Sequence, residues 1–186
     1  MIDYNILADS VDFYSNRGYK YIELPWIIEK DYIEFTYKES NKFILQDNRS
    51  LLGSAEQSFI KLYKENRLRG SFQSITPCFR NDNIDEIHQE SFMKNEIFVN
   101  DYISSDRLLE LINECLEFYK KHTNIESIIE AVKTKDEFSL ESYDININGI
   151  EVGSYGIRTV EDISWIYGTG LALPRFTHTQ QRNKIG

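Results

Sequence analysis

Two stretches of the sequence decide the fold: FQSITPCFR at Phe72–Arg80 and FMKNEIFV at Phe92–Val99. Both are rich in residues that favour extended backbone, and we expect them to form two neighbouring strands. A polar and charged stretch, residues 81–91, joins them. Because a loop of that length inside a hairpin is usually functional, we expect this one to hold a ligand.

Alternation along the second strand separates a charged face from an apolar face. The charged face also carries aromatic rings, and its members are Phe92, Lys94, Glu96 and Phe98. Arg80 ends the first strand, so a cation, a carboxylate and a ring would meet at the mouth of the hairpin. This combination suits a nucleotide, since arginine binds phosphate through a rigid fork, a ring stacks on a base, and a carboxylate accepts from an amine or binds Mg²⁺. An ordinary sheet face with cross-strand ion pairs would explain the same pattern.

Helix and strand signals along the rest of the chain do not alternate regularly. Apolar periodicity with cap or stop residues predicts helices at residues 3–16, 55–68 and 106–121. Strands are predicted at residues 19–24, 42–46, 138–147 and 150–155, with a turn at 47–50 and an Asn148-Gly149 turn between the last two strands. Residues 26–40 are irregular or partly helical, and an apolar segment at 163–167 leads through Gly168-Thr169-Gly170 to Pro174 at the start of a final helix. Hairpins with helices between them predict an α+β fold, in which helices flank an antiparallel β-sheet.

Size and composition narrow the function classes. The chain has 186 residues and 21.9 kDa, which predicts a single domain over residues 1–186. Its 30 acidic and 21 basic residues give a net charge of −9, which argues against broad, salt-driven adhesion to nucleic acid. Two cysteines and three histidines offer neither a disulfide framework nor a zinc-ligand cluster, and they fit a reducing, cytoplasmic setting. No apolar run is long enough to predict a membrane span or a leader peptide.

Three segments, in order, resemble the motifs of class II aminoacyl-tRNA synthetases. Cys78-Phe79-Arg80-Asn81-Asp82, a loop with His88, and the returning Phe92 and Glu96 resemble motif 2. Gly168 to Arg175 (GTGLALPR) resembles motif 3, particularly its seryl-type version, and residues 3–25, ending in Pro25, resemble the dimer-forming motif 1. The resemblance implies a catalytic core that works as a homodimer through the region 1–25.

Two further segments match the same family. Gly53-Ser54-Ala55-Glu56 resembles the segment whose Glu holds the amino group of the bound amino acid. Glu151 to Arg158 (EVGSYGIR) resembles the strand whose Glu binds Mg²⁺ and ATP, and it is also similar to a segment of ammonia-dependent asparagine synthetase, a relative that does not charge tRNA.

The resemblance implies a role for each matched residue. Arg80 would hold the α-phosphate and the substrate carboxylate, and Arg175 the γ-phosphate, which makes these two the catalytic cations. Phe92 and Arg175 would sandwich the adenine, Glu96 would accept from the adenine amine or help the metal, and His88 would reach the outer phosphates. Glu151 would bind Mg²⁺, while Ser54, Glu56 and Ser154 would contact the amino acid.

Several of these residues also have ordinary structural explanations. Gly168 and Gly170 suit a tight turn or a close backbone approach, and Glu56 suits the first turn of a helix. His88 could be a polar loop residue and Ser154 a plain strand hydroxyl. One departure from the family is Asp82, which stands where motif 2 usually has Glu.

The residues and the resemblance together predict ATP- and Mg²⁺-dependent activation of an amino acid, or a similar carboxylate, as its adenylate. The acceptor is open: a carrier protein, a small amine, ammonia, or a tRNA brought by a partner, since the chain leaves no segment for an anticodon-binding domain. Two alternatives remain, a catalytically silent paralogue that binds a regulatory ligand or partner, and an amide-forming ligase of the asparagine synthetase type. The site hypothesis requires Arg80, Glu96, Glu151 and Arg175 to face one cleft.

Overall fold

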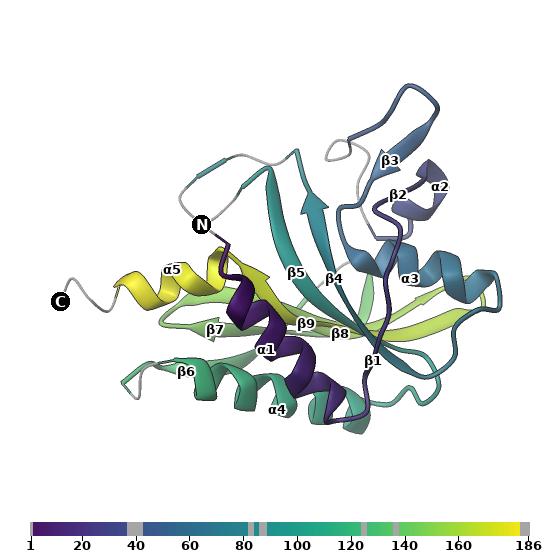
Figure 1. The fold of residues 1–186 in the computed structure, drawn as a ribbon. Helices are drawn as coiled ribbons and strands as arrows, with labels where there is room; N and C mark the ends of the chain where they lie inside the picture. Colours follow the sequence, from purple (N-terminus) through teal and green to yellow (C-terminus); the bar gives the residue numbers. More distant parts are fainter. Residues whose placement is uncertain are drawn as a thin grey trace.

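A computed structural model describes residues 2–36, 43–81, 84–85, 89–123, 126–135 and 138–182. Its centre is a seven-stranded sheet in the order β1-β4-β5-β9-β8-β7-β6. The strands are β1 (Lys20–Tyr21), β4 (Ser71–Phe79), β5 (Ser91–Val99), β6 (Ile129–Thr134), β7 (Ser139–Ile147), β8 (Ile150–Val160) and β9 (Ile163–Leu173). Only β1 pairs in parallel, with β4, and every other pair of neighbours is antiparallel. The predicted α+β fold is therefore confirmed (Figure 1).

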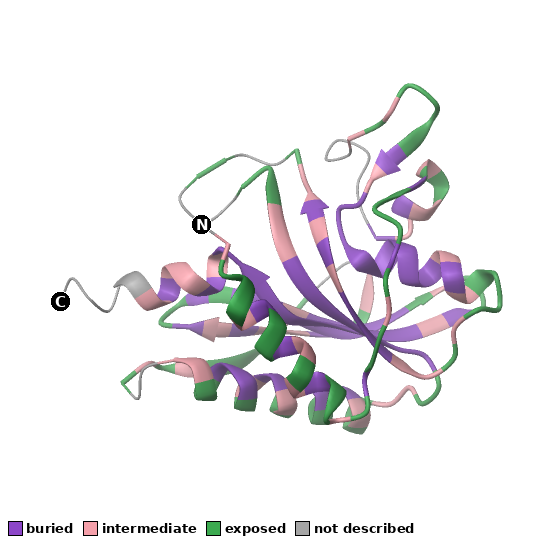
Figure 2. Ribbon diagram, in the orientation of Figure 1, coloured by how far each residue is buried: buried purple, intermediate pink, exposed green. Residues whose placement is uncertain are grey.

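Two helices cover one face of this sheet. They are α1 (Tyr4–Ser15) and α4 (Ser105–His122), capped at their N-termini by Asp3 and Ser104. In Figure 1 they lie along the same side of the strands, and the Phe118 ring contacts the Phe13 and Tyr14 rings between them. Their inward faces are buried and their outward faces exposed, as Figure 2 shows.

The opposite face carries α3 (Ala55–Lys64), whose N-terminus is closed by a capping box of Ser54 and Gln57. Phe59 of α3 stacks on Phe98, with ring centroids 5.0 Å apart, and Phe98 stacks on Trp165. Because successive side chains of a strand point to opposite faces, β5 sends Ile97 to the α1/α4 core and Phe98 to the α3 core.

Smaller elements complete the described structure. A two-stranded sheet pairs β2 (Ile27–Glu29) with β3 (Arg49–Leu51), α2 (Lys30–Ile33) follows β2, and α5 (Arg175–Arg182) follows β9. Figure 1 shows α3 beside this small sheet and α5 at the far end of β9.

Several predicted elements are confirmed and others need correction. The helices at 3–16, 55–68 and 106–121 are present, the second ending early at Lys64. The strand at 19–24 shrinks to Lys20–Tyr21, the predicted turn at 47–50 overlaps β3, and β2 and β6 were not predicted. Part of the segment 42–46 lies outside the described residues, and Ile44 makes an isolated bridge to Ser50.

The glycines at 168 and 170 lie inside β9, so they form no turn between strand and helix. Instead they allow close approach of the α1/α4 layer. A Cβ on Gly168 would lie 2.8 Å from Leu111 Cδ2, and one on Gly170 would lie 2.7 Å from Tyr14 Cε2. The pairing of β5 with β9 shifts register at Asn95 and Glu96, so that Gly170 is the extra residue of a bulge, and its carbonyl accepts a 2.9 Å hydrogen bond from the Tyr14 hydroxyl.

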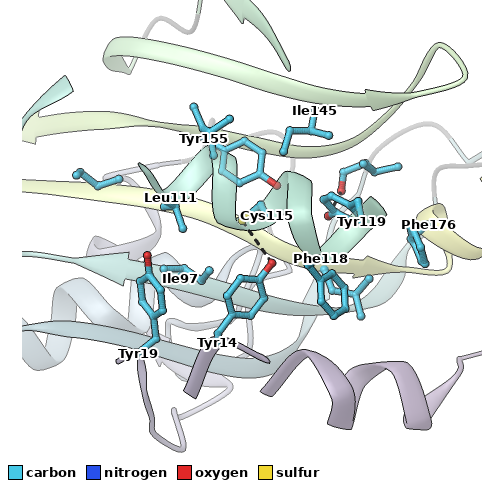
Figure 3. Packing of buried hydrophobic residues seen from close by; sticks show 14 of the residues in the cluster. Tyr14, Tyr19, Ile97, Leu111, Cys115, Phe118, Tyr119, Ile145, Tyr155 and Phe176 are labelled. Carbon is cyan, nitrogen blue, oxygen red and sulfur yellow. Dashed lines mark hydrogen bonds between the residues drawn. The ribbon is translucent and has the colours of Figure 1, made fainter. Parts of the chain in front are cut away.

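Figure 3 shows how this hydroxyl reaches its place. The rings of Tyr14, Tyr155 and Tyr119 converge with Cys115 and Leu111 between the sheet and α4, all of them buried. The Tyr14 hydroxyl lies 3.4 Å from the Cys115 sulfur there, the contact drawn as a dashed line. The α1/α4 core therefore fixes the path of β9, which ends at the candidate site.

Candidate functional site

A cavity of about 100 Å³ opens where β4 and β9 end and β5 and β8 begin. Its lining includes a set of charged or aromatic side chains: Arg80, Phe92, Lys94, Glu151 and Arg175. Ser154 and Thr169 add hydroxyl groups. Two strand pairs that are distant from each other in sequence, β4/β5 and β8/β9, therefore place most of the predicted site residues in one cleft.

Arg80 and Phe92 form the wall on the β4/β5 side. The Arg80 guanidinium carbon lies 5.2 Å from the centre of the Phe92 ring, within cation–π range. Arg80 Nε donates a 3.1 Å hydrogen bond to the carbonyl of Gly53, and the Arg80 amide donates to the carbonyl of Glu90 at 2.9 Å. These contacts fix the guanidinium at the cavity rim.

Arg175 and Glu151 form the opposite wall. Arg175 is the first residue of α5, immediately after Pro174, and its NH1 donates to Glu151 Oε1 at 2.9 Å. Their side chains are 21% and 46% exposed, so both remain reachable from solvent. A cation in a helix's first turn opposes the helix dipole, so this arginine is not explained by helix stability.

Lys94 projects into the floor of the cavity beside Glu96. Lys94 Nζ lies 2.7 Å from Glu96 Oε1, and both residues are more than nine-tenths buried. Glu96 also accepts 2.6 Å hydrogen bonds from the Ser54 hydroxyl and the Ala55 amide at the start of α3. Burial acts to raise the pKa of the Glu96 carboxyl, but the Lys94 charge and these donors hold the pKa below its ordinary value.

Glu96 therefore differs from its predicted role at the adenine or the metal. It does not line the cavity, and its two oxygens are already bound by Ser54, Ala55 and Lys94. Ser54 also differs from its predicted contact with the amino acid. Its hydroxyl caps α3 and donates to Glu96, and Ser54 does not line the cavity.

Glu56, in the first turn of α3, is buried and also lies outside the cavity lining. Its carboxylate forms a buried ion pair with Arg158 and accepts from the Trp165 indole N–H at 2.5 Å. Burial raises the pKa of the Glu56 carboxyl above its ordinary value, against the lowering effect of Arg158. The predicted contact between Glu56 and a substrate amine thus has an internal competitor, the Arg158 guanidinium, which also stacks on Tyr167 at 4.1 Å.

Two predicted site residues remain, Ser154 and His88. Ser154 lines the cavity, where its amide donates to Thr169 Oγ1 at 3.4 Å. His88 and Asp82 lie outside the described residues. Sequence reasoning assigned no role to Lys94 or Thr169; the strand alternation had placed Lys94 on the charged face, which was the available signal.

The donor set bears on Mg²⁺. Within the described ranges, no group of three or more His, Cys, Asp or Glu side chains could hold a metal by itself. Of the described residues that line the cavity, Glu151 is the one with a reachable carboxylate, which fits Mg²⁺, since this ion is usually bound by one or two carboxylates together with substrate phosphates and water. Glu96 does not fit, because its oxygens are occupied.

Among the described residues, no helix is both long and apolar enough to cross a membrane.

Comparison with known proteins gives sequence matches to one kind of enzyme. The serine–tRNA ligase of Encephalitozoon cuniculi (strain GB-M1) is 26% identical over 129 residues, which cover 60% of this chain and 30% of that protein. The serine–tRNA ligase of Cenarchaeum symbiosum (strain A) is 24% identical over 132 residues, covering 59% and 31%. The matches thus span less than a third of the length of these relatives. No family model matches the chain.

Solved structures match over nearly the whole chain. Seryl-tRNA synthetase from Pyrococcus horikoshii complexed with ATP superposes with a TM-score of 0.78 at 17% identity, over 92% of this chain and 48% of that one. The pyrrolysyl-tRNA synthetase PylSc of Desulfitobacterium hafniense gives a TM-score of 0.78 at 15% identity, over 96% and 68%. These matches confirm the predicted resemblance: the chain has the fold of class II aminoacyl-tRNA synthetase catalytic cores and is similar in sequence to serine–tRNA ligases.

Proposed function

We propose that this chain binds ATP and Mg²⁺ in the cavity and activates the carboxylate of an amino acid, or a similar acid, as its adenylate. The observation that carries the proposal is the meeting of Arg80, Phe92, Glu151 and Arg175 around one cavity. The similarity to a synthetase structure solved with ATP, and to the Naegleria fowleri serine–tRNA ligase solved with AMP (TM-score 0.72, 17% identity), supports it.

The reaction needs positioning more than covalent chemistry. A carboxylate oxygen attacks the α-phosphorus of ATP, the bond from that phosphorus to the bridging oxygen breaks, and pyrophosphate leaves. Arg80, anchored through Gly53, would orient the α-phosphate and the attacking carboxylate. Arg175 would bind the outer phosphates, and Phe92 would stack on the adenine. Mg²⁺ held through Glu151 would neutralise phosphate charge.

One observation favours the alternative of a ligand-binding protein without activation chemistry. Both buried carboxylates near the cavity, Glu56 and Glu96, are satisfied by cations of the chain itself, Arg158 and Lys94. A substrate ammonium would have to displace Arg158 to reach Glu56. The amide-forming alternative differs only in the acceptor, which would be ammonia or a small amine in place of a carrier protein or a tRNA.

We further propose that the chain is a homodimer through the segment that follows α1. Three large apolar side chains of this segment are exposed: Tyr21, Trp26 and Ile27. Tyr21 lies in β1, the edge strand of the main sheet, where unpaired backbone groups are also available to a second copy.

The test is ATP–pyrophosphate exchange with each standard amino acid in the presence of Mg²⁺. Exchange that depends on one amino acid would support adenylation and identify the substrate. If no amino acid supports exchange and calorimetry detects no ATP binding, the activation proposal fails. ATP binding without exchange would favour the ligand-binding alternative, or a non-standard carboxylate.

A further inference from the structure

We propose that Lys94 is a third substrate-binding cation of the cavity, which contacts an oxyanion of the bound substrates, and that Glu96 is its positioning residue. The oxyanion is a nucleotide phosphate or the carboxylate of the acid. The inference rests on the proposed function and assigns a role to a residue that the motif resemblance leaves without one.

The backbone leaves Lys94 little choice of direction. It lies in β5, which is paired on both sides, with Thr76 of β4 and Ala172 of β9 opposite Lys94. Side chains two residues apart share a face, so Lys94 lies between Phe92 and Glu96. Phe92, Lys94 and Ala172 all line the cavity, whereas Glu96 lies beyond it.

The ammonium group has unused donors. Lys94 is 9% exposed, and within the described part of the chain its one hydrogen-bond or ion-pair partner is Glu96. An ammonium carries three donors, and a buried charge with unfilled donors is costly. Since this one borders a cavity, an anionic ligand would complete its shell.

Glu96 is itself held in place, so it fixes the position of the Lys94 ammonium. The Ser54 hydroxyl and the Ala55 amide draw on both oxygens of the Glu96 carboxylate at the N-terminus of α3. Among the described residues, the cavity lining contains three cations, Arg80, Lys94 and Arg175, against the carboxylate of Glu151 in the lining and that of Glu96 behind Lys94. In a chain of net charge −9 this local excess of positive charge favours an anion.

The experiment compares Lys94→Met/Glu96→Gln, Lys94→Arg and an Arg67→Ala control on a chain that is otherwise unchanged. The double substitution removes the charged pair together, so no unpaired buried charge remains to unfold the protein. Arg67 is an exposed residue paired with Glu65, and it does not line the cavity. Thermal unfolding first establishes that each variant is folded.

Two readouts distinguish the two oxyanions. ATP and AMP are titrated by calorimetry without any acid, and the KM of the amino acid that supports exchange is then measured. If Lys94 binds nucleotide phosphate, the double variant loses about 10- to 100-fold in affinity for both nucleotides, and Lys94→Arg restores much of it. If it binds the carboxylate, nucleotide affinity is kept and the KM rises by a similar factor.

A folded double variant with wild-type nucleotide affinity and wild-type KM would overturn the inference and leave the proposed function standing. A wild-type chain that binds no ATP and supports no exchange would overturn both together. A structural role for the Lys94–Glu96 pair would change the unfolding temperature alone.

Discussion

Arg175 NH1 donates a 2.9 Å hydrogen bond to Glu151 Oε1 between the first turn of α5 and the start of β8. The pair joins the residue proposed to bind outer phosphates to the residue proposed to hold Mg²⁺. The two charges neutralise each other in this structure. When phosphate and metal bind together, Arg175 would contact the phosphate and Glu151 the metal, and the ion pair would separate. Because the pair is partly exposed to solvent, breaking it costs little free energy, since exposed ion pairs contribute about 0.2–1 kcal/mol.

This relationship predicts opposite effects of Glu151→Gln with and without metal. In EDTA, Arg175 is released from its partner, and ATP affinity should rise by about 1.5- to 5-fold. With Mg²⁺, exchange activity should fall, because the metal loses its carboxylate. Calorimetry and exchange assays check the two halves, with Arg175→Ala expected to weaken ATP binding in both conditions. An equal change in ATP affinity for Glu151→Gln with and without Mg²⁺ would contradict the assignment.

Substitution of Phe92 should separate the base from the phosphates. Phe92→Ala removes the stacking surface, which contributes about 1–3 kcal/mol per base in other proteins, so ATP affinity should fall by about 5- to 150-fold. Phe92→Tyr, which keeps the ring, should bind ATP nearly as the wild type does. Tripolyphosphate, which has no base, should bind the wild type and Phe92→Ala alike; a parallel loss of tripolyphosphate affinity would point to a collapsed cavity.

The buried pair of Glu56 and Arg158 predicts a pH-dependent loss of stability. Arg158→Met leaves the Glu56 carboxylate without its cation, and removal of one partner of a buried pair costs about 3–5 kcal/mol of unfolding free energy. Burial already raises the pKa of Glu56 above the ordinary 4.5, and without Arg158 the folded-state pKa should rise further. Denaturant unfolding at several pH values measures the effect.

The sign follows from proton linkage. A carboxyl whose pKa is raised on folding is tolerated below its unfolded pKa and costs stability as pH rises through the folded value. The deficit of Arg158→Met should therefore be small below about pH 4.5 and should grow as pH rises from there through the folded-state pKa of Glu56. Arg158→Met/Glu56→Gln, which removes both charges, should recover much of the neutral-pH stability. A deficit that does not change with pH would mean that Glu56 is not the group left unpaired.

If the chain is a homodimer as proposed, Trp26→Glu should dissociate the dimer into monomers. Trp26 is 54% exposed beside Ile27, and a charge there would be buried without a partner in the interface. Sedimentation at micromolar concentration should show a dimer for the wild type and a monomer for the variant. Leu140→Glu, at a residue that is 76% exposed on β7, serves as the control and should remain dimeric. A monomeric wild type would reject the interface.

The sequence predicts most of the framework because the signals there are local. The α4 helix carries an apolar stripe and an N-cap serine, and β5 carries a clear alternation, so each reports its own structure. The glycines of β9 were harder to interpret, since turn and close approach use the same residue. Tertiary contacts decide between them. A side chain at Gly168 would collide with Leu111 and one at Gly170 with Tyr14, and both neighbours lie far away in the sequence.

The site was also predictable only in part, because some of its residues belong to local motifs and others depend on tertiary contacts. Arg80, Phe92, Glu151, Ser154 and Arg175 line the cavity as the motif resemblance implied. Glu96 and Glu56 do not. Glu96 is bound by Ser54 and Ala55 of α3 as well as by Lys94 on its own strand, and Glu56 is bound by Arg158; the contacts with α3 and with Arg158 are tertiary, and no short motif encodes them. A carboxylate in a motif is thus insufficient evidence for a ligand contact until its internal donors are known.

The most direct test of the account is ATP–pyrophosphate exchange in Arg80→Ala, measured with the amino acid that supports exchange in the wild-type chain. Arg80 is the residue proposed to hold both the α-phosphate and the attacking carboxylate, so its loss should lower the exchange rate by about 10²- to 10³-fold while the protein remains folded. Arg67→Ala, on the exposed surface, should keep the wild-type rate. Exchange in Arg80→Ala at the wild-type rate would contradict the claim that this cavity is where a carboxylate is activated.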